Sequence, residues 1–161
     1  MTRNQDKGCA LVTGASSGIG AIYADRLARR GHDLILVARN RERLDALAQR
    51  IQRDTNRKVR TLVADLNSRA DLARVEDVLR TDASITLLAN NAGVGATAPL
   101  LASEVDKMVE MIELNVTALT RLTYAVVPGL VARGGGAIIN IASIVGIAPE
   151  VLNGVYGGTK A

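Results

Sequence analysis

The stretch that decides the fold is Thr13-Gly14-Ala15-Ser16-Ser17-Gly18-Ile19-Gly20, which follows the apolar run Cys9-Ala10-Leu11-Val12. Gly14 can take backbone angles that are closed to other residues, Gly18 lets the main chain approach a ligand, and Gly20 lets a following helix press against the strand. The N-terminus of that helix offers unpaired N–H donors and partial positive charge. We therefore predict a phosphate-binding turn, which the order of strand, turn and helix favours over a purely structural turn.

A βαβ unit is predicted around this turn. The helix after the turn has apolar residues at helical spacing, namely Ile19, Ile22, Tyr23 and Leu27. Gly31 lies where a helix C-cap is expected. The run Leu34-Ile35-Leu36-Val37-Ala38 is continuously apolar, as expected of a parallel strand that is covered on both faces.

Helices and strands alternate along the rest of the chain. Asn40 is expected to cap a helix whose buried residues are Leu44, Leu47, Ala48 and Ile51. Ser68 and Asp71 resemble a capping box that opens a helix with Leu72, Val75 and Leu79 inward. Further strands are predicted at 59–64, 85–89 and 137–142, and a long helix from about Ser103 towards Arg133 is expected to be interrupted at Pro128. This alternation predicts an α/β fold, a doubly wound parallel sheet of the Rossmann type, in a single domain over residues 1–161.

Composition limits the class of protein. With 161 residues, 48% of them hydrophobic, the chain is long enough to bury a core. No apolar run reaches the length of a membrane span and the stretch before Lys7 has no signal-peptide core, so we expect no membrane association and a cytoplasmic location. The single cysteine, Cys9, cannot form an internal disulfide, and the single histidine, His32, has no second His or Cys nearby. No metal site is therefore predicted.

Positive charge is concentrated in one part of the chain. The formal net charge is +4, and residues 26–60 hold eleven Lys or Arg against four acids. Because aromatic residues make up only 2% of the chain and Trp and Phe are absent, no stacking platform for bases is evident and we predict no nucleic-acid partner. Most of these arginines are expected to form a solvated helix face.

Polar residues follow the predicted strands. In parallel sheets of this kind, ligands bind at the carboxyl ends of the strands. Thr13, Arg39, Asp65, Asn91 and Ser143 each end or follow a predicted strand. We expect these residues along one edge of the domain, where they would form a binding site.

The end of the chain carries a chemical pair, Tyr156-Gly157-Gly158-Thr159-Lys160. If the segment is helical, its phenol and ammonium groups lie on one face, and a nearby cation stabilises a phenolate. Ser143 can donate a hydrogen bond to a substrate oxygen while Tyr156 transfers the proton. The alternative is an ordinary exposed Tyr–Lys pair.

Together the motifs resemble those of the short-chain dehydrogenase/reductase family, over the whole chain and in the family's order: Thr13-Gly14-x3-Gly18-x-Gly20, Asp65, Asn90-Asn91-Ala92-Gly93, Asn115, Ser143 and Tyr156-x3-Lys160. The resemblance implies hydride transfer between a nicotinamide cofactor and a small-molecule carbonyl or alcohol substrate. It implies that Tyr156 is the catalytic acid or base and that Ser143 orients the substrate. Lys160 would stabilise the phenolate and bond the nicotinamide ribose, and Asn115 would hold a water in the proton relay.

The cofactor-binding residues expected from the glycine-rich turn are Gly14, Ser16, Ser17, Gly18, Ile19 and Gly20. The resemblance also implies that Asp65 and Leu66 border the adenine, and that Asn91, Ala92 and Gly93 line the adenosine ribose side. An acidic residue after the second strand would favour NAD, but Arg39 stands there and can form a fork of hydrogen bonds to a 2′-phosphate, with Ser16 or Asn40 as secondary contacts. We therefore predict NADP in preference to NAD. The alternative is that Arg39 belongs to the solvated basic face.

The sequence ends at Ala161, directly after Lys160. Members of the family continue with two further strands and a variable loop over the substrate, so the expected sheet is truncated after its fifth strand and the substrate is not specified. Two hypotheses follow: an NADP-dependent oxidoreductase whose polypeptide is longer, or a catalytically inactive, truncated nucleotide-binding or interaction module. Since the family commonly pairs through the long helix and the helix that starts at Tyr156, a full-length chain is expected to form a homo-oligomer, either a dimer or a tetramer.

Overall fold

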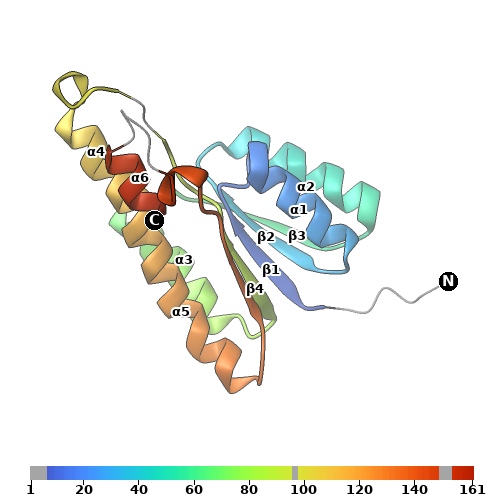
Figure 1. Ribbon diagram of the computed structural model, residues 1–161. Helices are drawn as coiled ribbons and strands as arrows, with labels where there is room; N and C mark the ends of the chain where they lie inside the picture. Colours follow the sequence, from blue (N-terminus) through green and yellow to red (C-terminus); the bar gives the residue numbers. More distant parts are fainter. Residues whose placement is uncertain (1–6, 96–97, 149–153) are drawn as a thin grey trace.

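Five parallel strands form the centre of the molecule (Figure 1). The computed structural model describes residues 7–95, 98–148 and 154–161, so the polar stretch before Lys7 lies outside the described residues. The strands are β1 (Cys9–Thr13), β2 (Asp33–Ala38), β3 (Val59–Val63), β4 (Ile85–Asn90) and β5 (Ala137–Asn140), in the order β3-β2-β1-β4-β5. Since β2 and β4 pair with opposite sides of β1, the sheet is doubly wound, as predicted.

Helices cover both faces of this sheet. On one face lie α1 (Gly18–Arg29) and α2 (Arg41–Thr55) (Figure 1). On the other lie α3 (Arg69–Thr81) and a long helix, which consists of α4 (Val105–Ile112), the π-helical turn η2 (Glu113–Ala118) and α5 (Leu119–Ala132). The shorter elements are the 3-10 turns η1 (Leu100–Ala102) and η3 (Ile144–Gly146), and the helix α6 (Gly154–Lys160).

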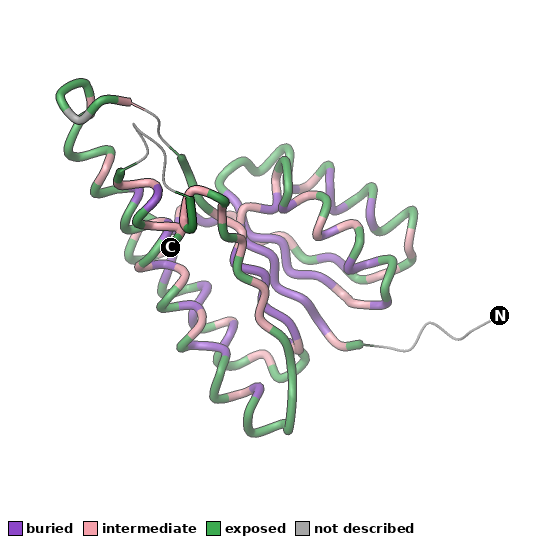
Figure 2. Tube along the Cα trace, in the orientation of Figure 1, coloured by how far each residue is buried: buried purple, intermediate pink, exposed green. Residues whose placement is uncertain are grey.

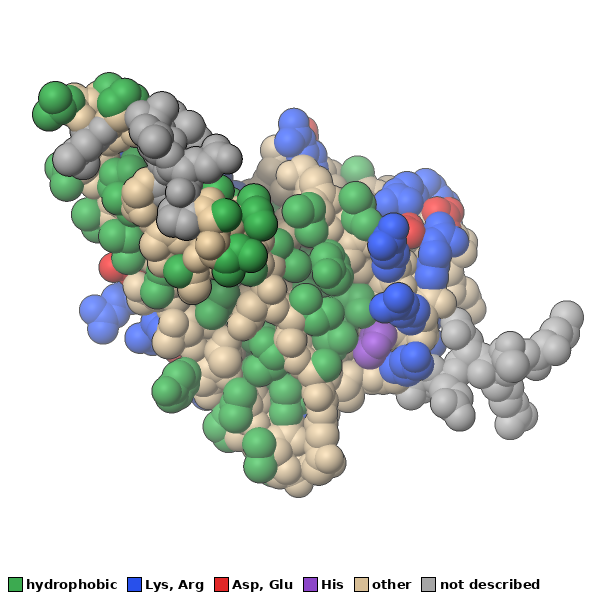
Figure 3. Space-filling model, viewed as in Figure 1, with side chains coloured by type: hydrophobic (Ala, Val, Ile, Leu, Met, Phe, Trp, Pro, Cys, Tyr) green, Lys and Arg blue, Asp and Glu red, His purple; other side chains and the backbone are tan. Residues whose placement is uncertain are grey.

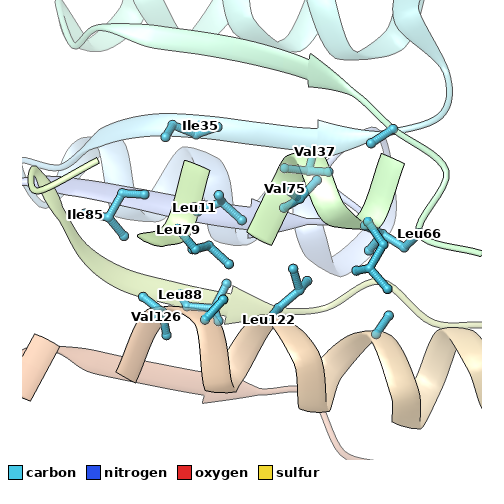
Figure 4. Close-up of a cluster of buried hydrophobic side chains, with 14 of the residues drawn as sticks. Leu11, Ile35, Val37, Leu66, Val75, Leu79, Ile85, Leu88, Leu122 and Val126 are labelled. Carbon is cyan, nitrogen blue, oxygen red and sulfur yellow. The ribbon is translucent and has the colours of Figure 1, made fainter. Parts of the chain in front are cut away.

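Each face of the sheet has its own apolar core, because successive strand residues point to opposite faces. Leu11 and Leu88 pack with Val75 of α3 and Leu122 of α5 on one face (Figure 4). Residues of α1 and α2 cover the other face, and buried residues follow the central strands (Figure 2). The buried stripes predicted for α2 and α3 are confirmed: Leu44, Leu47, Ala48 and Ile51 in α2, and Leu72, Val75 and Leu79 in α3.

The predicted caps are formed, one of them only in part. Asn40 Oδ1 accepts the Arg43 N–H at 2.9 Å and begins α2. Ser68 Oγ accepts the Asp71 N–H at 3.4 Å and begins α3. The Asp71 carboxylate does not complete the capping box, because the Ser68 N–H donates to the Asp65 carbonyl at 2.9 Å; Asp71 accepts the Asp65 N–H at 2.9 Å. This second bond connects the start of α3 to the chain that follows β3.

The buried face of α1 agrees with the predicted apolar positions at Leu27 and in part at Tyr23, but not at Ile19 and Ile22. Ile19 and Ile22 are each 54% exposed, whereas the residues turned to the sheet are Gly20, Ala24, Leu27 and Ala28. The physical reason is the packing of Gly20, where a Cβ atom would lie 2.9 Å from the Gly14 carbonyl carbon. Because the helix touches the glycine-rich turn at this point, its side with small residues faces the sheet.

The long helix continues through Pro128, so the predicted interruption there is wrong. Pro128 and Tyr124 are both exposed, and solvent can satisfy the Tyr124 carbonyl that the proline leaves without a backbone donor. The helix departs from α geometry at η2 instead. Its 28 residues, with a mean hydropathy of 1.2 over the most apolar window, are long and apolar enough to cross a membrane. This is weak evidence, because core helices pass the same test, and Leu122 and Val126 of this helix lie in the core.

β5 is shorter than predicted and ends at Asn140 rather than at residue 142. The Ile141 N–H still donates to the Asn90 carbonyl at 3.0 Å. The chain then leaves the sheet, which places Ser143 at the sheet edge in front of η3.

Candidate active site

A cleft of about 630 Å³ lies at the carboxyl ends of the strands. It is lined by the glycine-rich turn, by the segments that follow β2 to β5, and by α6. The predicted site residues in this lining are Gly14, Ser16, Ser17, Ile19, Arg39, Asp65, Leu66, Asn91, Ala92, Gly93, Ser143, Tyr156 and Lys160. The structure therefore brings residues as far apart in the sequence as Gly14 and Lys160 to one cleft.

The glycines of the turn have different roles. Gly14 has a φ of 64°, and a Cβ atom on it would lie 2.7 Å from Asn91 Nδ2. Gly18, which was also predicted to bind the cofactor, has a φ of 54° and faces open space, but it is not among the residues that line the cleft. Gly20 is buried outside the cleft lining and serves the packing of α1. Ser17 at the N-cap makes no side-chain hydrogen bond to α1, so donors of the first turn are left for a ligand.

Hydrogen bonds fasten the chain after β4 to the glycine-rich turn. Thr13 Oγ1 accepts the N–H groups of Asn91 and Ala92, each at 3.0 Å, and donates to the Ala89 carbonyl at 3.3 Å. Asn91 Nδ2 donates to the carbonyls of Thr13 at 2.9 Å and Gly14 at 3.2 Å. Asn91 thus lines the cleft and also connects the chain after β4 to the glycine-rich turn.

Basic residues gather at one end of the cleft. Arg39 and Asn40 follow β2 and are exposed in the lining, close to the glycine-rich turn. The lining also contains Arg43, which the sequence motifs did not predict as a site residue. The sequence contained a signal for this position, because the cap at Asn40 places Arg43 in the first turn of α2, beside the same sheet edge.

Part of the wider basic face forms exposed ion pairs, as expected of a solvated surface. Lys and Arg side chains cluster over α1 and α2 on the right of the molecule (Figure 3). Asp25 binds Arg29 at 2.8 Å and Arg50 at 3.1 Å. Ion pairs of this exposed kind contribute little stability and require no ligand.

Asp65 lies in the cleft wall after β3. Its N–H donates to Asp71 Oδ2, and its Oδ1 accepts the Asn67 N–H at 3.0 Å. The bond from the Asp65 N–H, together with the guanidinium of Arg74, holds the pKa of the Asp71 carboxyl below its usual range. The backbone at Asp65 is therefore fixed by an ionised partner.

Ser143, Tyr156 and Lys160 all line the cleft, on the β5 side and away from the basic residues that follow β2. Lys160 Nζ donates to the Ile141 carbonyl at 3.1 Å, which holds the ammonium group beside the end of β5. A Cβ atom on Gly146 would lie 2.6 Å from the Lys160 carbonyl carbon, so the turn after Ser143 packs directly on α6. Tyr156 and Lys160 occupy successive turns of one helix, as the predicted spacing requires.

Asn115 lies outside the lining of this cleft. Its side chain is 2% exposed and binds the backbone of Val94, with Oδ1 accepting the N–H at 2.9 Å and Nδ2 donating to the carbonyl at 2.8 Å. Asn115, Thr159 and Lys160 contribute to a second cleft of about 250 Å³. A water held by Asn115 stays a prediction.

These residues fit a nicotinamide dinucleotide. The first turn of α1, with Ser16 and Ser17 in the lining, suits a pyrophosphate, and a phenol and an ammonium group stand at one end of the same cleft. The lining also includes residues that no motif predicted, among them Val94, Gly95, Ile141 and Ala142. No group of three or more potential metal-ligating side chains occurs in the described ranges.

The comparison with known proteins agrees with this geometry. The sequence model of the family described as short chain dehydrogenase matches residues 8–161. The bulky-bulky ketone-specific alcohol dehydrogenase from Comamonas testosteroni has a TM-score of 0.93 and 46% identity, over 96% of this chain and 62% of that chain. A short-chain dehydrogenase from Sphingobium yanoikuyae in complex with NADPH has a TM-score of 0.92 and 53% identity, over 95% and 60%.

A curated relative is the very-long-chain 3-oxoacyl-CoA reductase-B of Danio rerio, which is 36% identical over 156 residues, or 94% of this chain and 50% of the relative. The chain thus spans about half the length of the curated relatives that it matches. The family match over nearly the whole chain, together with the fold and the cleft, shows that the chain belongs to the short-chain dehydrogenase/reductase family.

Proposed function

We propose that the protein containing this chain is an NADP(H)-dependent oxidoreductase that interconverts a carbonyl compound and the corresponding alcohol. The observation that carries the proposal is the meeting of Ser143, Tyr156 and Lys160 with the glycine-rich turn in one cleft. The relatives named for ketone and 3-oxoacyl substrates support a ketone as the carbonyl compound.

The side chains have complementary roles in such a reaction. A nicotinamide held in the cleft would supply a hydride to the carbonyl carbon, or accept one from the alcohol. Tyr156 Oη donates its proton to the carbonyl oxygen, and takes the proton back in the reverse direction. Ser143 donates a hydrogen bond that stabilises the charge developing on that oxygen. The Lys160 ammonium group lies on the same face of α6, one turn after Tyr156, and adds positive charge to this end of the cleft.

The preference for NADP is argued from the basic end of the cleft. Arg39 occupies the position where an acidic residue would accept the ribose hydroxyls of NAD. Arg43 adds a second guanidinium to the same wall, and two such groups suit a 2′-phosphate. The NADPH complex of the Sphingobium yanoikuyae relative supports this preference.

The activity is tested with the full-length protein, by following NADPH oxidation with a panel of ketones and aldehydes. Tyr156→Phe should lower kcat by about 100-fold or more, because it removes the proton donor, while the Kd for NADPH stays close to the wild-type value. Tyr124→Phe is the matched control, since Tyr124 is 79% exposed on α5. Unchanged turnover in the Tyr156 variant would refute the proposal.

The cofactor preference is tested by binding. Arg39→Ala should raise the Kd for NADPH about 10- to 100-fold, the range expected for losing a charge-assisted hydrogen bond, and leave the Kd for NADH unchanged. Arg41→Ala is the control, because Arg41 is exposed beside the cleft but absent from its lining. Equal affinity of the wild-type protein for NADH and NADPH would contradict the preference.

We also propose that the full-length protein forms a homo-oligomer through the long helix. Apolar residues are exposed on this helix at intervals of three or four positions, namely Val105, Val109, Ile112 and Val116. An exposed apolar stripe of this kind typically packs against a partner protein. Light scattering after gel filtration should show a dimer or tetramer that Val109→Glu dissociates, and a monomeric wild-type protein would refute the proposal.

A further inference from the structure

The hydroxyl group of Thr159 joins two elements of the candidate active site. Thr159 Oγ1 donates to the Tyr156 carbonyl within α6 at 2.8 Å. The same oxygen accepts a hydrogen bond from Asn115 Nδ2 at 2.9 Å. Since Asn115 comes from η2, 44 positions earlier in the chain, one hydroxyl connects the helix of Tyr156 with the π-helical turn.

The connection extends further through Asn115 to the chain after β4. The Asn115 amide binds both backbone groups of Val94, and Val94 itself lies in the cleft lining. Because Asn115 is only 2% exposed, its amide hydrogens depend on protein partners, and Thr159 provides one of them. A continuous polar chain thus runs from Val94 through Asn115 and Thr159 to the backbone of Tyr156.

α6 has little stability of its own. It is seven residues long and has Gly157 and Gly158 in its interior, and glycine is unfavourable inside helices. Gly157 is buried and brings the helix close to its neighbours, but it offers no side chain that sets the rotation of the helix. The bonds from Thr159 to Asn115 and from Lys160 to the Ile141 carbonyl supply that orientation.

We propose that Thr159 is a positioning residue of this site. It holds the backbone of α6 so that Tyr156 and Lys160 face the cleft, and it orients the amide of Asn115 at the same time. The inference rests on the proposed oxidoreductase function. Displacing a reacting group by about 1 Å can cost about 100-fold in rate, so a small rotation of α6 is sufficient to impair turnover.

Two substitutions in the full-length protein separate the hydroxyl from the shape of the side chain. Thr159→Val keeps the branched shape and removes the hydroxyl, whereas Thr159→Ser keeps the hydroxyl. The valine variant should lose about 10- to 100-fold in kcat, with a much smaller change in the Kd for NADPH, and the serine variant should retain turnover. Hydrogen–deuterium exchange of residues 154–160, which needs no turnover, should be faster in the valine variant only.

Thr55→Val is the matched control. Thr55 Oγ1 also donates to a helix carbonyl, that of Ile51 at 2.7 Å, and accepts a backbone N–H, that of Arg57 at 3.3 Å. It lies in α2 outside the lining of both clefts, so this variant should keep the wild-type kcat.

A valine variant with wild-type kcat per folded molecule would overturn the proposal, even if its Tm were lower, and so would equal losses in the valine and serine variants. The two proposals fail separately. Retained turnover in Tyr156→Phe refutes the function, whereas unaltered exchange of residues 154–160 in Thr159→Val refutes the positioning role.

Discussion

The contact of Gly20 with the glycine-rich turn leads to a quantitative prediction for Gly20→Ala. A Cβ atom on Gly20 would lie 2.9 Å from the Gly14 carbonyl carbon and 2.5 Å from Asn91 Nδ2. The second distance is about 1 Å short of an ordinary contact, and the neighbouring atoms are backbone or hydrogen-bonded to it. Because both contacts must be relieved, α1 must move away from the turn and Asn91 must release its bonds.

The expected loss of stability follows from these contacts. Overpacking of a tight site costs about 1–3 kcal/mol, and the two bonds of Asn91 Nδ2 contribute about 1 kcal/mol each. The higher helix propensity of alanine than of glycine offsets about 1 kcal/mol of this loss. The free energy of unfolding should therefore fall by about 2–4 kcal/mol, which lowers Tm by about 5–15 °C in a domain of this size.

The assay combines thermal unfolding of the full-length protein with NADPH binding. The variant should also bind NADPH about ten-fold more weakly or worse, because the first turn of α1 moves relative to Gly14 and each 1.4 kcal/mol is ten-fold in affinity. Gly135→Ala is the control, since a Cβ atom on Gly135 meets open space. Wild-type Tm and Kd in the Gly20 variant would refute the steric argument.

Two further predictions concern buried ionisable groups. Glu76 is 2% exposed and binds Arg80 at 2.6 Å and Arg121; burial raises the pKa of its carboxyl, but the hydrogen bonds of Arg121 and Arg80 outweigh this and hold the pKa below the ordinary 4.5. The stabilisation that the Glu76 carboxylate gives the folded state is therefore complete above pH 4.5 and is lost as the pH falls below that value. Glu76→Gln should lower the free energy of unfolding by about 2 kcal/mol at neutral pH and flatten its dependence on pH below 4.5, as measured by urea unfolding. Parallel pH profiles of the variant and the wild type would contradict this prediction. Burial, and after it the charge of Asp82, raises the pKa of the Cys9 thiol to about 12. Thiol reagents should therefore modify Cys9 only when the protein unfolds. Rapid modification of the native protein would refute this prediction.

Much of the fold was predictable because its determinants are local. The apolar runs of β1 and β2, the caps at Asn40 and Ser68 and the stripes of α2 and α3 depend on residues a few positions apart, and the structure agrees with them. The cleft was also predictable in outline. Parallel strands end at one edge, so the residues that follow them meet there wherever they stand in the sequence.

Other features were decided only by tertiary packing. The apolar spacing predicted that Ile19 and Ile22 belong to the buried face of α1, but the contact of Gly20 with Gly14 sets that face. The sequence also predicted an interruption of the long helix at Pro128, but the helix continues through the proline. Each outcome depends on surroundings that local periodicity does not describe.

The same holds for the interior of the site. Local sequence determined that a strand, a glycine-rich turn and a helix follow one another, because propensity, capping and backbone freedom act over a few residues. Only the assembled structure joined Asn115 to Val94 and Thr159, which are 21 and 44 positions away, and added Arg43 to the cleft. Buried amides take whichever partners the packed chain places beside them, so these bonds arise from the tertiary structure and not from any local pattern.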